Sequence, residues 1–289
     1  MNQIRDAVLE LIRLCSTDLP SDVEEALIQA HHSEKRGSIA FNVLREIIEN
    51  IRIARQDVVP LCQDTGALDF NIDYPPDIKQ NLILQAIVAA IKMATRKHLL
   101  RPNSVDSLNG HNTGNNIGPG HPFICYNQWN RKYLSIKLML KGGGSENVGT
   151  QYSLPAESLG ALRDLDGVER CVVDAVYQAQ GRGCPPTIVG VGIGGDRATS
   201  YLLSKEQLFR KLNKRNPLAK LDRMEKQLHQ KLNRLGIGPM GLGGKTTVLG
   251  VKIGAANRIP ASFFVSVSFM CWACRRYTLT LKNGVASYD

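Results

Sequence analysis

Apolar residues recur every three or four positions through the first part of the chain, which is the spacing of one face of a helix. The first such set consists of Ile4, Val8, Leu11 and Ile12. A second set follows Pro20, where Ser21 or Asp22 can cap the helix, and a third set covers residues 39–55. Residues 1–56 are therefore expected to form a helical N-terminal segment.

Beyond residue 56, short apolar runs alternate with longer stretches of helical period. The runs expected to form strands cover residues 67–72, 123–126, 133–140, 187–193, 248–253 and 261–269. The stretches expected to form helices cover residues 77–98, 155–182 and 198–235, with a break at Pro217. Such alternation is typical of an α/β (mixed α+β) fold in which helices flank a mixed sheet. We expect a single domain over residues 1–289, with its α/β core at 57–289.

Three glycine-rich turns and one long polar loop interrupt this pattern. The turns cover residues 141–147, 194–196 and 236–247, and the loop covers residues 101–122. Long loops inside a compact domain are usually functional or disordered. Glycine lets main-chain N–H groups approach a ligand or another strand closely. The turns are therefore candidates for a binding site.

Two of these segments resemble nucleotide-binding motifs without their context. Residues 190–195 satisfy the pattern G-x-G-x-x-G after a predicted strand, but a long basic helical region follows and no second strand is near. Gly244-Lys245-Thr246 resembles the end of a P-loop, but Pro239 stands where the first glycine is required. We therefore expect no nucleotide site, and only Lys245 is considered as an anion-binding residue.

The chain has a net charge of +10 and a clear basic block at residues 205–231. No aromatic residues are interleaved there for base stacking, so a solvated helical face is a simpler interpretation than nucleic-acid binding. No apolar run approaches the roughly 18 residues of a membrane helix. The N-terminus lacks the apolar core of a signal peptide. We expect no membrane association and a cytoplasmic location.

The seven cysteines are an odd number, which disfavours a disulfide framework in a chain of cytosolic character. Three of them lie in apolar surroundings and are interpreted as small buried hydrophobes: Cys15, Cys125 and Cys171. Cys271 and Cys274 form a C-x-x-C pair beside two arginines, which suits redox chemistry. The same spacing suits zinc, but zinc needs about four ligands and a second pair is missing.

The remaining pattern takes one cysteine from each of three turns. Cys62, Cys184 and Cys271 each lie at the boundary of a predicted element. Cys62 lies in the turn 60–66, PLCQDTG, which places a thiol, an amide, a carboxylate and a hydroxyl on consecutive residues. Three thiolates without a fourth ligand suit a [4Fe–4S] cluster with one open iron, and an open iron is a Lewis acid.

These turns belong to five longer motifs: PLCQDTG, KGGGSEN, GCPPTIVGVGIGGD, NRLGIGPMGLGGKTTVLGVKI and PASFFVSVSFMCWACRR. Together the motifs resemble class I, iron–sulfur fumarate hydratases. The likeness is to the separate α subunit of the two-subunit form and to the α subunit of L(+)-tartrate dehydratase, and it covers nearly the whole chain. The resemblance implies a [4Fe–4S] cluster on Cys62, Cys184 and Cys271, with Cys274 as a neighbour. It also implies the reversible hydration of fumarate to (S)-malate.

The resemblance assigns further roles around the cluster. Gln63 and Asp64 are implied to contact a small dicarboxylate substrate, and Asp64 is the candidate general acid–base group at its hydroxyl. Arg101 is implied to clamp a substrate carboxylate through two parallel hydrogen bonds. Main-chain N–H groups of a glycine-rich loop can receive a carboxylate. That loop is matched by Gly144, Asn147 and Gln151.

Two departures from the family pattern stand out. Ile259 occupies a position where many members have a histidine that pairs with the group equivalent to Asp64, and isoleucine can neither hydrogen-bond nor carry charge. Arg258 and His111 are considered as substitutes. The family's other half, which supplies the catalytic base and more carboxylate-binding residues, is not in this chain. We therefore expect a separate β subunit in an α2β2 assembly.

The choice of substrate rests on residues 144–147, GSEN, which favour fumarate. The alternatives of the same class are the α subunits of L(+)-tartrate dehydratase and of a mesaconate hydratase. An alternative of another class is a non-catalytic iron–sulfur sensor, or a nucleic-acid-binding protein that uses the basic block 205–231.

Overall fold

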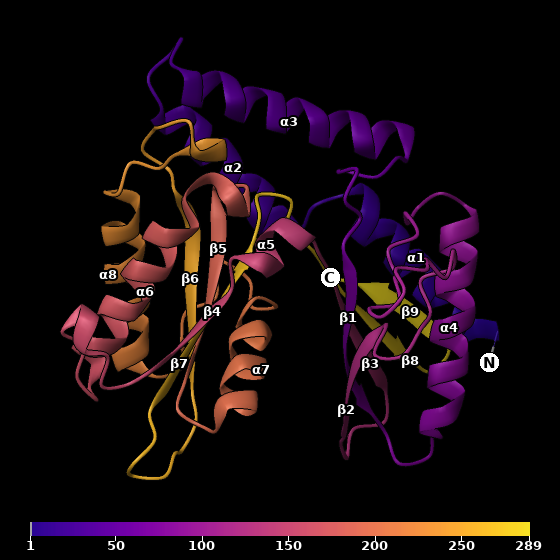
Figure 1. Cartoon of the computed structure of the whole chain (residues 1–289). Helices are drawn as coiled ribbons and strands as arrows, with labels where there is room; N and C mark the ends of the chain where they lie inside the picture. The colour runs from indigo at the N-terminus through magenta and orange to yellow at the C-terminus, as the bar shows by residue number, and fades with distance from the viewer. Residues whose placement is uncertain (1) are drawn as a thin grey trace. The chain divides into compact units, whose positions relative to one another are not determined.

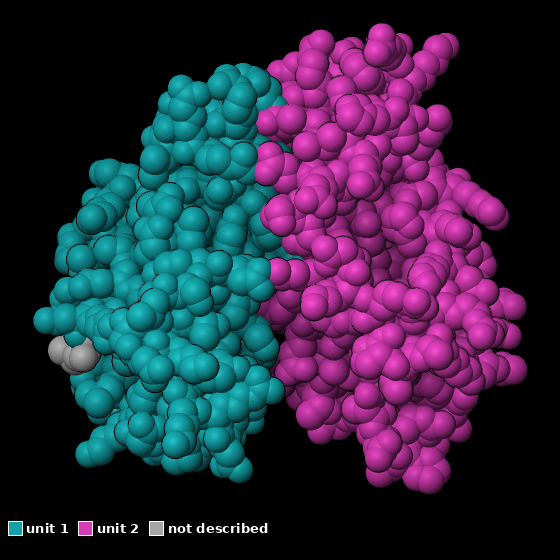
Figure 2. All heavy atoms as spheres, turned by 180° about the vertical axis from the view of Figure 1, so that it is seen from behind, with its two compact units in different colours: residues 1–20, 49–143, 273–289 teal, residues 21–48, 144–272 magenta. Residues whose placement is uncertain are grey.

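A computed structural model describes residues 2–289 of the chain. The chain forms two compact units, each assembled from separate segments of the sequence (Figure 2). Unit 1 comprises residues 1–20, 49–143 and 273–289, and unit 2 comprises residues 21–48 and 144–272. No helix within residues 2–289 has both the length and the apolar character needed to cross a membrane.

Three helices occupy the N-terminal part of the chain, as the apolar spacing predicts. They are α1 (Asn2–Thr17), α2 (Ser21–Ser33) and α3 (Ile39–Asp57). The apolar face of α1 buries Val8, Leu11 and Ile12 completely in the core of unit 1. Helix α2 lies within unit 2, and α3 contributes residues to both units.

Unit 1 is built on a five-stranded sheet in the order β2-β1-β3-β8-β9. Its strands are β1 (Ala67–Tyr74), β2 (Phe123–Gln128), β3 (Leu134–Lys141), β8 (Arg275–Lys282) and β9 (Val285–Tyr288). Strands β1 and β2 are parallel, and the other neighbours are antiparallel. Helices α1 and α4 (Gln80–Arg96) pack together against this sheet (Figure 1).

Unit 2 is built on a four-stranded sheet in the order β4-β7-β5-β6. Its strands are β4 (Thr150–Ser153), β5 (Thr187–Ile193), β6 (Val248–Ala255) and β7 (Phe264–Met270). Helices α6 (Leu165–Ala179) and α8 (Ala219–Asn233) cover one face, and α7 (Arg197–Gln207) covers the other (Figure 1). Short helices also occur at α5 (Gly143–Asn147), η1 (Glu157–Leu159), η2 (Gln180–Gly183) and η3 (Pro239–Gly241).

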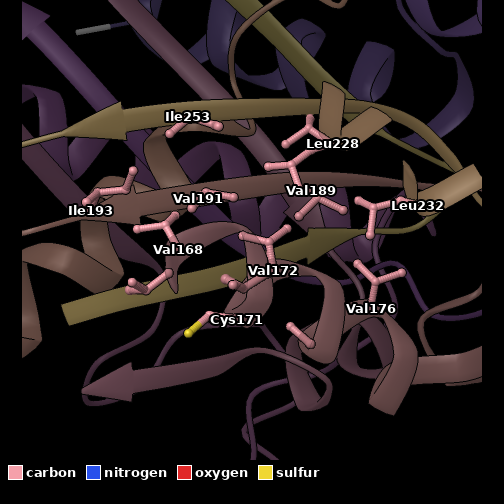
Figure 3. Packing of buried hydrophobic residues seen from close by; sticks show 14 of the residues in the cluster. Val168, Cys171, Val172, Val176, Val189, Val191, Ile193, Leu228, Leu232 and Ile253 are labelled. Carbon is pink, nitrogen blue, oxygen red and sulfur yellow. The ribbon is translucent and has the colours of Figure 1, made fainter. Parts of the chain in front are cut away.

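Strand β5 shows why its sequence alternates glycine with larger apolar residues. Successive side chains of a strand point to opposite faces. Val189, Val191 and Ile193 therefore enter the core beneath α6 and α8 (Figure 3). Gly190 and Gly192 face α7, where a Cβ would overlap the main-chain oxygens of its serines. The glycines of the G-x-G-x-x-G pattern thus permit a close contact between a helix and a sheet.

The predicted mixed α/β class is confirmed, with some differences in its elements. The structure has two sheets where the sequence analysis expected one, and it adds β4, β8, β9 and the short α5. The helix expected from residue 155 begins at Leu165, because the side chain of Asp164 accepts the N–H of Gly167 at 2.7 Å and caps it there. The expectation that residues 1–289 form one domain stays a prediction.

Candidate functional site

The turn around Cys62 lies in unit 1 and is anchored at both ends. The N–H of Leu61 donates to the carbonyl of Ser16 at 2.9 Å, and the Asn50 side chain donates to the carbonyl of Leu61 at 3.0 Å. At the other end Gly66 has φ +83°, and a Cβ there would lie 2.8 Å from the main chain of Lys141. Only glycine fits both this conformation and this close approach. The turn consequently presents Cys62 half-buried and Gln63 exposed.

Main-chain N–H groups hold the carboxylate of Asp64 from two sides. Oδ1 accepts the N–H of Gly66 at 3.0 Å, and Oδ2 accepts the N–H of Gly143 at 2.7 Å. The Asp64 carbonyl accepts Nη1 of Arg275 at 2.7 Å. Gly142 adjoins the same carboxylate, since a Cβ there would lie 3.1 Å from Oδ2. The acidic group is therefore fixed in position by Gly66 and by the glycines at the start of α5.

A pocket of about 410 Å³ in unit 1 joins the Cys62 turn to Arg101. Its lining consists of Pro60, Cys62, Gln63, Thr65, His98, Leu100, Arg101 and Pro102. The side chains of Gln63 and Arg101 are exposed, so an amide and a guanidinium are available at one opening. Such a pair suits an anionic ligand, because a guanidinium binds a carboxylate through two parallel hydrogen bonds. The structure thus brings together three of the residues that the sequence analysis assigned to one site.

The turns of Cys184 and Cys271 meet at one edge of the unit 2 sheet. Strands β5 and β7 are antiparallel, with Ile188 opposite Met270, so the start of β5 lies beside the end of β7. The N–H of Trp272 donates to the carbonyl of Cys184 at 3.1 Å across this edge. Both thiols are half-buried, and all seven cysteines are free of disulfide bonds. Two of the three candidate cluster ligands therefore lie on neighbouring turns of one unit.

The sequence matches the family described as fumarate hydratase (Fumerase) over residues 5–280. A relative from Geobacillus stearothermophilus, whose name assigns it to class I fumarate hydratase, is 50% identical over 279 residues. The match covers 96% of this chain but 54% of that relative, so the chain spans about half its length. The chain belongs to the class I fumarate hydratase and L(+)-tartrate dehydratase α-subunit family.

Two relatives with names from the other branch of this family match along nearly their whole length. One, from Methanocaldococcus jannaschii, is named as an L(+)-tartrate dehydratase subunit alpha and is 37% identical over 97% of this chain and 98% of its own. The L(+)-tartrate dehydratase subunit alpha of Escherichia coli K12 is 33% identical over 96% of this chain and 91% of its own. The family resemblance drawn from the motifs is confirmed. The names of these relatives refer to two substrates, fumarate and L(+)-tartrate.

The remaining residues assigned by the family resemblance lie in unit 2. Gly144 and Asn147 both lie on α5 and are exposed to solvent. The amide of Gln151 is engaged inside the unit: Nε2 donates to the carbonyl of Arg197 at 2.7 Å and to Oγ of Ser266 at 2.9 Å. Gln151 therefore secures β4 against its neighbours, and its contact with a substrate stays a prediction.

The two residues considered as substitutes for the missing histidine have other surroundings. Nη1 of Arg258 donates to the carbonyls of Ile259, Pro260 and Ser262 at 2.8–3.2 Å, so it closes its own loop. His111 lies in the exposed part of the loop 101–122. Across residues 2–289, no hydrogen bond or ion pair joins the ring of His111 to Asp64. In unit 1 the partners of the Asp64 carboxylate are main-chain N–H groups.

The turn around Lys245, which resembles a P-loop, has a binding partner within the protein. Its main-chain N–H groups bind the carboxylate of Glu34, a residue of the same unit. Oε1 of Glu34 accepts the N–H groups of Lys245 at 2.7 Å and Thr246 at 3.2 Å, and Nζ of Lys245 donates to the carbonyl of Ser33 at 2.8 Å. Lys245 therefore helps to hold the N-terminal part of unit 2, and its binding of a ligand anion stays a prediction.

Much of the basic block 205–231 is paired within the unit rather than fully solvated. The buried carboxylate of Asp222 accepts Arg215 and Lys226, both at 2.8 Å, and buried Glu225 accepts Arg210 at 2.7 Å. Hydrogen bonds from Arg215 and Lys226 hold the pKa of Asp222 well below its usual range. Asp222 with its two partners, and Glu225, line a pocket of about 310 Å³ beside α8. Paired charges offer less attraction to nucleic acid than free ones.

Sequence reasoning missed Gly143 and Arg275 as parts of the site. Gly143 stands in the KGGGSEN motif without an assigned role, and its N–H donates to the Asp64 carboxylate. Arg275 was considered only as a neighbour of the C-x-x-C pair, yet it is 1% exposed and binds the main chain of Asp64. A buried arginine directly after a cysteine motif is the signal that could have identified it, since arginine is seldom buried without a partner.

Proposed function

We propose that the chain is the α subunit of a hydro-lyase that reversibly hydrates fumarate to (S)-malate. The observation that carries the proposal is the construction of the Cys62 turn, which presents Gln63 and Arg101 at one pocket and fixes Asp64 between two N–H groups. The higher identity to the relative named for fumarate, 50% against 37% and 33%, supports fumarate as the substrate.

The donor set fits an iron–sulfur cluster. Cys62, Cys184 and Cys271 are half-buried cysteines on turns, whereas Cys15, Cys171 and Cys274 are buried and half-buried Cys125 lies on strand β2. Among residues 2–289, no three side chains of His, Cys, Asp or Glu are placed to hold a single metal ion. A cluster differs from one ion because each cysteine binds a different iron atom, which requires wider spacing. We propose that Cys62, Cys184 and Cys271 hold a [4Fe–4S] cluster. When bound, the cluster would supply a Lewis acid for the hydroxyl group of the substrate.

The chain's own residues bind and orient the substrate. Arg101 offers two parallel N–H donors to one carboxylate, and the amide of Gln63 offers another hydrogen bond at the same opening. Asp64 keeps lone pairs beyond the two that Gly66 and Gly143 occupy, so it can accept a proton from the hydroxyl group or return one to it. We further propose that exposed Gly144 and Asn147 offer hydrogen-bond donors to a carboxylate, with Gln151 as an additional substrate contact.

A separate β subunit is proposed to complete the enzyme, in an α2β2 assembly. Two relatives of matching length are named as alpha subunits, and the chain spans about half of the Geobacillus relative. The names of these two relatives support a division of the enzyme between two polypeptides. The partner is then expected to contribute the groups that this chain lacks for complete catalysis.

The test is anaerobic co-expression of the chain with its candidate partner, followed by turnover assays. The complex should contain iron and acid-labile sulfide and should hydrate fumarate faster than it dehydrates L(+)-tartrate or hydrates mesaconate. Negligible turnover of fumarate beside rapid turnover of another substrate would refute the choice of substrate. A complex without iron would refute the cluster.

L(+)-tartrate dehydratase is the second candidate function. It is favoured by the near-complete coverage of the two relatives that carry this name, 98% and 91% of their own lengths. The same three-substrate comparison decides between the two, because the residues around Arg101 serve any dicarboxylate with a hydroxyl group. Mesaconate is included because its hydration follows the same chemistry.

A further inference from the structure

Polar side chains hold the main chain of Arg101 on both sides. Its N–H donates to Oγ1 of Thr65 at 3.0 Å, and its carbonyl accepts Nδ2 of Asn116 at 3.0 Å. Both contacts lie within unit 1. The guanidinium itself is exposed at the pocket of Cys62 and Gln63. The place of this side chain is consequently set through its backbone.

Asn103 connects Thr65 and Asn116 through hydrogen bonds to both residues. Its Nδ2 donates to Oγ1 of Thr65 at 3.2 Å and to the carbonyl of Gly66 at 3.3 Å, and its N–H donates to Oδ1 of Asn116 at 2.7 Å. We name Thr65, Asn103 and Asn116 the Arg101 network. The amide of Asn116 thus accepts on one side and donates on the other, which leaves its position strongly determined.

Two members of the Arg101 network are buried although Arg101 is exposed. Thr65 is 3% exposed and Asn116 is 1% exposed, and Nδ2 of Asn116 also donates to Oγ1 of Thr95 on α4 at 3.0 Å. Asn116 has φ +61°, a conformation that asparagine tolerates better than most residues. The network therefore ties the exposed arginine to the core of unit 1.

The loop that follows Arg101 offers little other support. Residues 105–112 are exposed throughout, and Leu108 retains 97% of its surface. Few apolar side chains of this loop are thus available to fix its start. Besides buried Leu100, which precedes Arg101, the hydrogen bonds of Thr65 and Asn116 anchor the main chain of Arg101.

We propose that the Arg101 network is a set of positioning residues that places the Arg101 guanidinium against Cys62 and Gln63 and thereby sets the affinity for a substrate carboxylate. The proposal rests on the proposed function, because it takes a carboxylate as the ligand of Arg101. Thr65 is the central member, since its hydroxyl receives both Arg101 and Asn103.

The test replaces Thr65 by valine, which keeps the shape and removes the acceptor. In the cluster-loaded complex, Thr65→Val should raise KM for the dicarboxylate between about tenfold and a hundredfold, with a smaller effect on kcat. Thr65→Ser keeps the hydroxyl and should restore KM to near the wild-type value. A matched control is Thr113→Val in the following loop, where the hydroxyl has no hydrogen-bond partner among the described residues. That control should leave KM unchanged.

A double-mutant cycle separates positioning from general damage. If the network acts through Arg101, then Thr65→Val should change KM little once Arg101 has been replaced by alanine. An equal increase of KM in both backgrounds would overturn the proposal. Should Thr65→Val fail to assemble, the half-buried Asn103→Ala variant serves in the same cycle.

Hydrogen exchange provides a readout that does not depend on turnover. Pro102 has no amide hydrogen, so in a short peptide that ends at Pro102 the last exchanging amide is that of Arg101. The deuterium uptake of that peptide therefore reports on few amides besides Arg101. Thr65→Val should accelerate exchange at Arg101, and Thr113→Val should not. If the wild-type complex turns over none of the three substrates, the proposed function is refuted. Accelerated exchange at Arg101 in Thr65→Val would in that case still support the positioning of Arg101 by the network. Unchanged exchange together with unchanged KM overturns it.

Discussion

The N–H of Gly143 donates to Oδ2 of Asp64 at 2.7 Å, although the two residues are far apart in the chain. With the N–H of Gly66 on Oδ1, this contact leaves the carboxylate a single orientation. Gly142 packs closely against the same oxygen, since a Cβ there would lie 3.1 Å from it. The glycines at the start of α5 thus bind or closely contact the carboxylate of Asp64.

Replacing Asp64 by asparagine should abolish most activity while preserving the fold. Asparagine fills the same space, but it carries no charge and its amide nitrogen cannot accept one of the two N–H groups. We expect kcat to fall by a factor of about 10² to 10⁴, the usual contribution of a general acid–base group. The measurement is steady-state turnover of the cluster-loaded complex.

The exposed Asp77→Asn variant is the control for that change, because it changes the net charge by the same amount at a position away from the site. Comparable losses in both variants would contradict the role of Asp64. Circular dichroism spectra of the two proteins should agree with that of the wild type.

Replacement of any one proposed cluster ligand by serine should remove the cluster. Cys62→Ser, Cys184→Ser and Cys271→Ser are each expected to lose most of their iron after anaerobic purification, since a cluster on three cysteines depends on each of them. Half-buried Cys125 is the matched control, because it lies on β2 of unit 1 and is expected to be no ligand. Iron and acid-labile sulfide content measure the outcome, and full retention in Cys184→Ser would contradict the assignment.

Gly192→Ala should destabilise unit 2 strongly. The new methyl group would overlap the carbonyl oxygen of Ser200, so α7 would have to move away from β5. Overpacking of this kind costs about 3 kcal/mol in the free energy of unfolding. Gly243→Ala is the comparison: nothing lies within 4 Å of its Cβ position, and its positive φ alone should cost about 1 kcal/mol. Denaturant unfolding of both variants measures the difference, and equal stabilities would refute the close packing of α7.

Stability should fall in acid partly because Asp222 becomes protonated. Its pKa is lowered in the folded state by Arg215 and Lys226, so the unfolded chain binds a proton at a higher pH than the folded one. The stabilisation is therefore complete at neutral pH, and it is lost as the pH falls below about 4, the usual pKa of an aspartate, toward the lower folded value.

The Asp222→Asn variant should accordingly be less stable than the wild type at pH 7 and approach it as the pH falls. The temperature of unfolding, followed from pH 7 to pH 3 by circular dichroism, tests this convergence. Parallel curves for the two proteins would show that the ion pairs of Asp222 contribute nothing to the acid response.

Local patterns in the sequence were sufficient for much of the fold. Helical spacing predicted the three N-terminal helices, because the burial of one face leaves its period in the sequence. Short apolar runs between turns predicted β1, β3, β5, β6 and β7. The motif PLCQDTG placed Cys62, Gln63 and Asp64 on one turn, since consecutive residues in a turn lie together wherever that turn is located.

Contacts between distant segments were decided by the tertiary structure. The partner of Asp64 is Gly143, the partner of Lys245 is Glu34, and the anchor of Arg101 is Thr65. The role of Gly190 and Gly192 depends equally on where α7 packs. Strand order and register determine these neighbours, and a local pattern of apolar and polar residues carries no record of them, because the same period suits many arrangements of the same elements.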